Sequence, residues 1–470
     1  MLRGLIGTSA FLVSGAMDAN NPGQSPANSE DDAVKRPNII VILADDLGYG
    51  DLGGYYGGRA NTPNINRLAR EGMLFTDFHS NGPMSSPTRA ALLTGRYQQR
   101  LGIETALPTD WDDRGIGSEA NKNEITIATY LRKSGYKTAI FGKWHLGKHS
   151  SANPVHHGFD EFRGLTCGSG DYFSKMDRNG FKDWWHNEDL SFQEGYATDV
   201  ITDNSVSYIN AHKDNPFFLY VAYNAIHFPW QTSEDYTLET VREGEDFTSS
   251  NPGPKSKLGP HQPEEIPSIV IQMIEELDKN VGRIIESLQE QGIEKNTLVF
   301  FTSDNGGYLN YNGSTWPKVS SNGPLRGQKG QLYEGGHRVP AIAWWPGHIP
   351  ASSVKNQTVM TFDILPTVLD LLGIKNPSGR GPNALDGVSI LPLLIQGKEL
   401  ASRTLFWRMG GQKAVRSGPW KLVVQGQNST PALYNLEDDI GESRDLSSKY
   451  PKKVQQLKEK LNAWGKDVNY

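Results

Sequence analysis

The sequence predicts an α/β fold, with a large, mostly parallel mixed sheet covered by helices on both faces and a small C-terminal antiparallel sheet followed by a helix. Two observations support this prediction. Apolar strand-like runs alternate with helical segments over most of the chain, which implies right-handed crossovers and a parallel sheet. After about Gly373 the pattern changes to a Pro/Gly/Asn-rich stretch and shorter β-type runs.

Four runs carry the strand signal. The first covers residues 38–44 and reads Asn-Ile-Ile-Val-Ile-Leu-Ala, which suits a strand buried on both faces. The others cover residues 137–141, 217–223 and 297–302.

Two helices are well marked between these runs. Thr126 is placed to cap a segment that ends at Gly135. Pro267 opens a longer segment, up to Gly292, in which apolar residues recur at helical spacing.

The predicted domain organisation has four parts. Residues 1–16 form a short, weak secretory signal pattern, which predicts a periplasmic or secreted protein, although a disordered tail fits the same residues. Residues 17–35 are a polar linker, residues 36–400 the main α/β domain, and residues 401–470 the antiparallel subdomain. The subdomain begins with β-type runs and ends with a helix from near Tyr450.

Composition excludes several classes of function. The formal net charge of −6 provides no global attraction for nucleic acid or an anionic membrane. No apolar run reaches membrane-spanning length, and the single cysteine, Cys167, allows no internal disulfide. Neither a G-x-G-x-x-G motif after the first strand nor a P-loop is present, which disfavours a redox or nucleotide-dependent enzyme.

Each predicted strand runs into polar, chemically active residues. Ligands of open parallel sheets bind outside the carboxyl ends of the strands, so we expect these residues to meet in one crevice. They are Asp45 and Asp46, Lys143 and His145, Asn224 and His227, and Asp304 and Asn305. Asp45 and Asp46 alone would fit a solvated turn. Together with Asp304 and Asn305 they form a set of oxygen donors, which favours calcium or magnesium over zinc.

A further segment, residues 84–96, combines Ser85 with a helix start. Pro87 suits a first helical position, so Ser85 is expected just before a helix N-terminus, where free N–H groups attract anions. An ordinary helix cap explains the same serine.

This segment resembles the signature of the formylglycine-dependent sulfatases, which belong to the alkaline phosphatase superfamily. Four more motifs match that family in the expected order, and the resemblance covers roughly residues 36 to 465. The matching segments are Ser85-x-Pro87-Thr88-Arg89 through Gly95-Arg96, Gly142-Lys143-Trp144-His145-Leu146-Gly147, Asp45-Asp46-Leu47-Gly48, Ser303-Asp304-Asn305-Gly306, and Lys329 through Glu334-Gly335-Gly336.

The resemblance implies a calcium-dependent sulfatase, a sulfuric ester hydrolase with an alkaline phosphatase-like fold. Asp45, Asp46, Asp304 and Asn305 would hold Ca²⁺ together with the side chain at Ser85. In that family the position equivalent to Ser85 is Cys, less often Ser, and this residue is oxidised after translation to formylglycine. The hydrated aldehyde attacks the sulfur of the ester.

The family also implies roles for five further residues. Lys143 and Lys329 would neutralise the sulfate oxygens, and Arg89 would orient the aldehyde hydrate. His227 would protonate the leaving alcohol. His145 would then take a proton from the second hydroxyl, so that sulfate leaves and the aldehyde is regenerated.

Ser85 departs from the commoner Cys, and three explanations fit. The protein is a native Ser-type sulfatase matured by a radical enzyme, an engineered Cys→Ser form that traps substrate, or an inactive relative that binds sulfated glycans. The intact motif disfavours the third explanation, and the family's usual Cys favours the second. Active enzyme requires a partner that generates formylglycine.

The substrate is expected to be a sulfated carbohydrate, with no nucleic acid partner. Aromatic loop residues beside charged groups suit stacking on sugar rings, although packing of a lid would use them equally. The predicted substrate-binding residues are Asp171, Trp184, Trp185 and His186. The alternative enzyme activity is hydrolysis of a phosphate or phosphonate monoester, which related enzymes perform with the same metal and formylglycine chemistry.

Overall fold

A computed structural model describes residues 36–109, 114–236, 241–245, 259–311, 316–377, 383–426 and 428–468. The predicted signal segment, residues 1–16, and the predicted linker, residues 17–35, lie outside the described residues. Residues 36–470 form one compact unit. The boundary near residue 400 between the two predicted domains stays a prediction.

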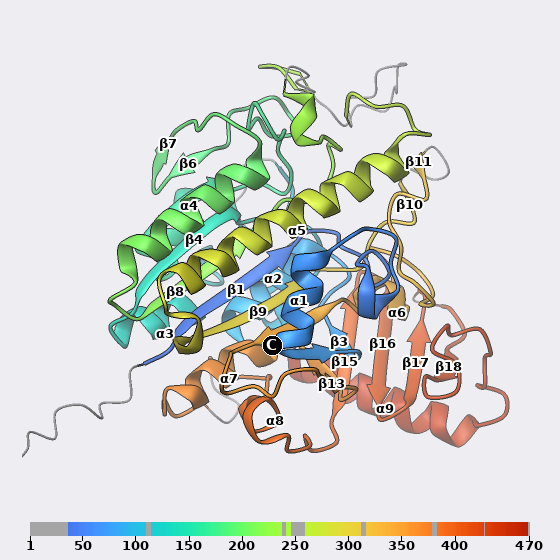
Figure 1. Cartoon of the computed structure of the whole chain (residues 1–470). Helices are drawn as coiled ribbons and strands as arrows, with labels where there is room; N and C mark the ends of the chain where they lie inside the picture. The colour runs from blue at the N-terminus through green and yellow to red at the C-terminus, as the bar shows by residue number, and fades with distance from the viewer. Residues whose placement is uncertain are drawn as a thin grey trace, which may run out of the picture. The chain divides into compact units, whose positions relative to one another are not determined.

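A mixed sheet of ten strands forms the centre of the described chain (Figure 1). Its five middle strands, β9-β1-β8-β4-β5, are parallel, and antiparallel strands follow on both sides. In spatial order the strands are β13 (Ser353–Lys355), β2 (Met73–Phe75), β12 (Ala341–Trp344), β9 (Thr297–Ser303), β1 (Asn38–Ala44), β8 (Phe217–Ala222), β4 (Lys137–Lys143), β5 (Glu161–Leu165), β6 (Trp185–His186) and β7 (Asp189–Leu190).

The four predicted strands are confirmed as β1, β4, β8 and β9, with ends that differ by no more than two residues. The largest difference is in β4, which continues through Gly142 to Lys143. A side chain at position 142 would place its Cβ 2.0 Å from the Ala222 carbonyl oxygen of β8. Glycine therefore lets β4 stay paired up to the residue that carries site chemistry.

Helices cover both faces of the sheet, as the alternating core residues of β1 show. Ile40 and Ile42 pack with α1, α4 and α5, while Ile39, Val41 and Leu43 pack with α2, α3, α7 and α8. The helices are α1 (Pro63–Glu71), α2 (Ser85–Thr94), α3 (Ile127–Lys133), α4 (Ala197–His212), α5 (Ile266–Glu290), α6 (Glu334–His337), α7 (Ile364–Leu371), α8 (Leu391–Gln396) and α9 (Pro451–Val468). Shorter 3-10 turns cover Gly54–Tyr56, Gln98–Leu101, Ser150–Ala152, Pro154–His157, Ser233–Asp235, Glu294–Asn296 and Thr361–Asp363.

The predicted helix signals are confirmed except at one start. The Thr126 side chain accepts a hydrogen bond from the Thr129 amide at 3.1 Å and caps α3. The prediction that Pro87 opens α2 is wrong, because the helix begins at Ser85 and Pro87 is its third residue. The N–H groups of the first helical turn have no acceptor within the helix, so proline, which lacks an N–H, fits any position of that turn. Its presence therefore does not fix the residue at which the helix starts.

The C-terminal part is an antiparallel sheet with a helix against it, as predicted (Figure 1). Its strands are β15 (Thr404–Met409), β16 (Gln412–Ser417), β17 (Trp420–Val424) and β18 (Ala432–Asn435). Leu457, Leu461 and Trp464 of α9 share a hydrophobic core with β15–β18 and with Ala91 of α2. Two small pairs remain, β3 (Phe78–His79) with β14 (Val359–Met360), and β10 (Asn310–Tyr311) with β11 (Trp316–Pro317). Over the described ranges, no helix has both the length and the apolarity to cross a membrane.

Candidate active site

The carboxyl ends of the four central strands hold the residues that the sequence places there. All of these residues are at least nine-tenths buried, so their polar atoms interact mainly with one another. Asp45 and Asp46 follow β1, Asn224 and His227 follow β8, Lys143 ends β4 and His145 comes two residues later, and Asp304 and Asn305 follow β9. Ser85 and Arg89 come from α2, and Lys329 from the loop before α6.

Ser85 lies between a carboxylate and an ammonium group. Its Oγ donates to Asp45 Oδ1 at 3.1 Å and lies 3.3 Å from Lys143 Nζ. Lys143 also forms an ion pair with Asp45. Burial lowers the pKa of Lys143, while the nearby Asp45 raises it. Residue 85 therefore sits between a carboxylate oxygen and a positive charge.

Arg89 lies one helical turn after Ser85 and joins two strand ends. Its Nη2 and Nε donate to Asp304 Oδ2 at 2.8 and 3.1 Å, and its Nη1 donates to the Lys143 carbonyl at 2.8 Å. Burial lowers the pKa of Arg89, but the surrounding groups, Asp304 first, together raise it above its ordinary value. The guanidinium is thus a permanent positive charge fixed beside the carboxylates.

Asp46 is the second centre of contacts. Its Oδ1 accepts from Lys329 Nζ at 2.6 Å and from Asn305 Nδ2 at 2.8 Å, and its Oδ2 lies 3.9 Å from His227 Nε2. Burial would raise the pKa of Asp46, but Lys329 and then His227 lower it below the usual value. The backbone of Asp46 has a φ of 65°, a strained conformation typical of functional positions.

Buried polar atoms without a hydrogen-bond partner remain among these residues at the strand ends. Asn305 Oδ1 is buried and has no hydrogen-bond partner among the described residues, and both polar side-chain atoms of Asn224 share that condition. Possible ligand atoms of Asp45, Asp46 and His227 all lie within 4.8 Å of one another. With Asp304 they form an oxygen-rich donor set that fits a hard cation such as Ca²⁺.

The loop that carries Asp304 and Asn305 rests directly on the segment 329–336. A Cβ at Gly306 would lie 1.9 Å from the Gly335 carbonyl oxygen, so only glycine permits this approach. The Gly306 amide donates to the Gly336 carbonyl at 3.0 Å. The position of the donor set therefore depends on the segment that also carries Lys329.

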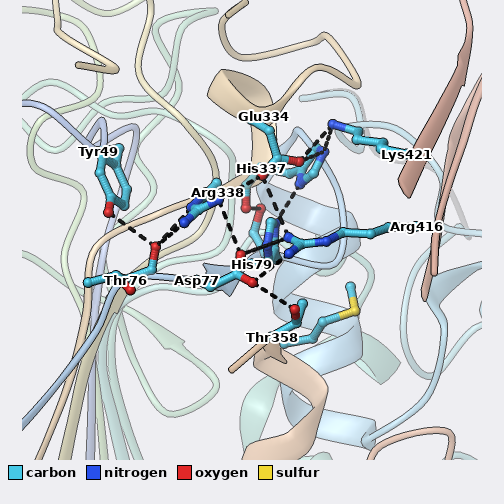
Figure 2. A network of polar contacts seen from close by, with 12 residues as sticks. Tyr49, Thr76, Asp77, His79, Glu334, His337, Arg338, Thr358, Arg416 and Lys421 are labelled. Carbon is cyan, nitrogen blue, oxygen red and sulfur yellow. Dashed lines mark hydrogen bonds and ion pairs between the residues drawn. The ribbon is translucent and has the colours of Figure 1, made fainter. Parts of the chain in front are cut away.

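A buried network of charged residues contacts the segment 329–336 and helps to fix its position (Figure 2). Glu334 accepts from Lys421 at 2.8 Å and from Arg338 at 3.2 Å, and Arg416 forms two 2.7 Å bonds to Asp77. Lys421 and Arg416 belong to β17 and β16, so the C-terminal sheet is linked by ion pairs to α6 and to Asp77, which lies two residues after β2. The other members are His79, His337 and Glu442.

The network contains three potential metal ligands but does not resemble a metal site. Ligand atoms of His79, Glu334 and His337 lie within 4.8 Å of one another. However, Arg416 and Lys421 each place a cationic nitrogen 3.1 Å from one of these imidazoles. Such positive charges would repel a metal ion, so the cluster is a structural ion-pair network.

The predicted substrate-binding residues lie in a separate segment. Asp171 is buried and accepts hydrogen bonds from two amides of its own turn. Trp184 is buried, Trp185 is partly exposed and donates to Asp183 at 2.8 Å, and His186 is exposed. Their role in binding stays a prediction.

Two supporting residues were missed from the sequence. The Leu107 carbonyl contacts His145 Nε2 at 3.1 Å, and the Tyr172 hydroxyl donates to the carbonyls of Asn224 and His227, each at 2.9 Å. A backbone carbonyl has no signal in residue type. Tyr172 lies in an aromatic loop, which is a visible signal in the sequence, but that signal does not predict its contact with the backbone of His227.

Two family models match the chain. Residues 37–374 match the model described as Sulfatase, and residues 328–467 match the model described as N-sulphoglucosamine sulphohydrolase, C-terminal.

Individual relatives agree with the family models. N-acetylgalactosamine-6-sulfatase of Rattus norvegicus is 36% identical over 406 residues, which cover 83% of this chain and 71% of that protein. Arylsulfatase A of Bos taurus is 32% identical over 473 residues, covering 88% and 84%. The crystal structure of Ps i-CgsB in complex with k-i-k-neocarrahexaose superposes with a TM-score of 0.78 at 31% identity, covering 93% of this chain and 94% of that one.

Proposed function

Since the chain belongs to the sulfatase family and is a sulfuric ester hydrolase, we propose that it removes sulfate from a sulfated carbohydrate with calcium and formylglycine in its active site. The carbohydrate class is supported by two similar proteins. One is named for an amino-sugar sulfate, and the other was solved with an oligosaccharide.

Calcium would be held by the oxygens of Asp45, Asp46, Asp304 and Asn305, with residue 85 beside them. The free, buried Asn305 Oδ1 supports this assignment, because a buried acceptor without a partner costs about 1–3 kcal/mol. A bound calcium ion supplies fixed positive charge for the oxygens of the sulfate group.

Residue 85 would carry the nucleophile. Formylglycine supplies, as its hydrate, a hydroxyl that is a better nucleophile than serine. The position supports this role, because Ser85 Oγ contacts both Asp45 and Lys143, and Arg89 lies one turn away. A formylglycine-generating or radical maturation enzyme is therefore a required partner. We also propose that the protein acts in the periplasm or outside the cell.

The surrounding lysines and histidines would have different roles: the lysines neutralise charge and the histidines transfer protons. Lys143 and Lys329 form ion pairs with Asp45 and Asp46 of the donor set and would neutralise sulfate oxygens. His227 has Nδ1 hydrogen-bonded to the Phe228 carbonyl at 2.7 Å. A carbonyl can only accept, so Nδ1 carries a hydrogen, and Nε2 is the atom that would take up a proton and then give it to the leaving alcohol. His145 would accept a proton from residue 85 in the second step.

The observation that carries the proposal is the contact of Ser85 with the oxygen-donor set at the strand ends. The test is the mass of the tryptic peptide Glu71 to Arg89 from the natural host, with sulfate release measured on matched sulfate and phosphate esters. Loss of two hydrogens from the encoded Ser, together with preference for the sulfate ester, would support a native Ser-type sulfatase. A Cys encoded at position 85 in the natural host would instead identify Ser85 as an engineered replacement, because formylglycine has the same mass whether it is made from Ser or from Cys. Unmodified Ser with binding but no turnover would refute the catalytic proposal and indicate a glycan-binding relative.

The carbohydrate assignment has its own test. Purified, matured enzyme would be assayed on sulfated galactosamine and carrageenan oligosaccharides and on a small aryl sulfate. We expect a higher kcat/KM on at least one oligosaccharide. Equal or better turnover of the aryl sulfate throughout would contradict a carbohydrate substrate while leaving the sulfatase assignment intact.

A further inference from the structure

His145 is held as one defined tautomer. Its Nε2 lies 3.1 Å from the Leu107 carbonyl oxygen, which can only accept, so Nε2 carries the hydrogen. Nδ1 is buried and has no hydrogen-bond partner among the described residues. Burial, and then Lys143, lower the pKa of His145 well below its ordinary value, which favours the neutral ring. Nδ1 is then a free lone pair.

Backbone packing fixes the plane of this ring. A Cβ at Gly168 would lie 2.4 Å from His145 Nε2 and 2.5 Å from Cε1, so the ring rests directly on the backbone at Gly168. The His145 amide donates to the Thr166 carbonyl at 3.2 Å, and its φ of 55° is left-handed. The ring therefore has little freedom to move away from Leu107.

Leu107 is held in turn by the residue next to the nucleophile. It lies outside the helices and strands, and its amide donates to Ser86 Oγ at 3.0 Å. Ser86 is fully buried and is the second residue of α2. A chain of contacts thus runs from Ser86 through the Leu107 backbone to His145.

We propose that Ser86 is a positioning residue that, through the backbone of Leu107, keeps His145 in the Nε2–H tautomer and leaves Nδ1 free to accept the proton from residue 85. The inference rests on the proposed function, in which His145 is the base. The helix that presents the nucleophile would then also set the tautomer of the base. A δ-protonated His145 would lack the lone pair that the second step requires.

The test compares Ser86→Ala and Ser86→Thr with the unchanged protein by ¹⁵N NMR of labelled histidines, using His145→Gln to assign the signal. We expect a single Nε2–H tautomer in the unchanged protein, a mixture in Ser86→Ala, and restoration in Ser86→Thr, which keeps the hydroxyl. In matured enzyme, kcat should fall about 10-fold in Ser86→Ala with KM unchanged. Rates are normalised to the formylglycine content at residue 85, measured by mass.

Ser205→Ala is the matched control, because Ser205 is a buried serine of α4. Within the described part of the chain its Oγ bonds only to its own helix, at the Ile201 carbonyl, 2.7 Å away. It should leave tautomer and kcat unchanged. If Ser86→Ala does not fold, Gly168→Ala displaces the ring by another route and should give the same tautomer mixture. A single Nε2–H tautomer with full kcat in the folded variant would overturn the proposal. If the NMR result holds but no form releases sulfate, only the proposed function fails.

Discussion

Replacing Lys421 with Met should destabilise the protein strongly, and the loss should grow with pH above about 7. The Lys421 ammonium is fully buried and lies 2.8 Å from Glu334, 2.9 Å from Glu442 and 3.1 Å from His337. Met fills a similar volume but leaves two carboxyl groups without their shared cation. Breaking a buried ion pair on one side typically costs about 3–5 kcal/mol.

The pH dependence follows from Glu442, whose pKa is raised by burial to about 7 from an ordinary 4.5, even with Lys421 present. The folded protein keeps a proton on Glu442 that the unfolded chain has released, so stability falls as pH rises from 4.5 to about 7. Above about 7 the unchanged protein releases the proton and this decline stops. Without Lys421 the proton stays bound, so the variant should lose about 1.4 kcal/mol more for each further pH unit.

Urea unfolding followed by tryptophan fluorescence at pH 6, 7 and 8 measures both effects. Lys413→Met on the neighbouring strand β16 is the control, because Lys413 is exposed and should change little. A loss below about 1 kcal/mol for Lys421→Met would refute the importance of the pair. A gap that does not widen from pH 7 to 8 would refute the role given to Glu442.

Three further predictions concern the site. Gly306→Ala should destabilise the fold by about 1–3 kcal/mol in thermal unfolding, since its Cβ would lie 1.9 Å from the Gly335 carbonyl oxygen. The control is Gly465→Ala on α9, where a Cβ would meet open space, and it should be neutral or stabilising. In calcium titrations, Asn305→Ala should lose most of the calcium-induced rise in melting temperature, and an unchanged rise would remove Asn305 from the ligand set. Trp185→Ala should lower kcat/KM on a sulfated oligosaccharide more than on an aryl sulfate, and equal losses would count against sugar binding.

The central fold and the core of the site were predictable for the same physical reason. A strand buried on both faces must be apolar along its length, so the run from Asn38 to Ala44 stands out in the sequence. The polar residues that follow such strands then stand out by contrast. The edge strands were not predictable, because β6 and β7 are two residues long and largely exposed, and pairing alone defines them.

The supporting contacts were hidden because they join distant residues of ordinary type. Asp77 and Arg416 have no signal in the sequence, and Glu334 is marked only as part of a family motif, yet the three meet in a buried network that links the C-terminal sheet to α6 and to the segment after β2. The burial of an ion pair depends on the whole fold, not on local pattern. The contact from Leu107 to His145 escapes prediction for a different reason, since it uses a carbonyl that every residue has.

The burial of α2 has a consequence for the proposed conversion of residue 85 to formylglycine. All ten residues of the helix are buried, and Ser85 is only 1% exposed, so a modifying enzyme cannot bind the folded segment. Beside it, β1 pairs with β8 and β9, which come from Phe217–Ala222 and Thr297–Ser303. During synthesis the N-terminal part must wait for those strands before the sheet can close. In the proposed function, conversion of residue 85 would therefore precede closure of the sheet, and faster folding would shorten the time available for it.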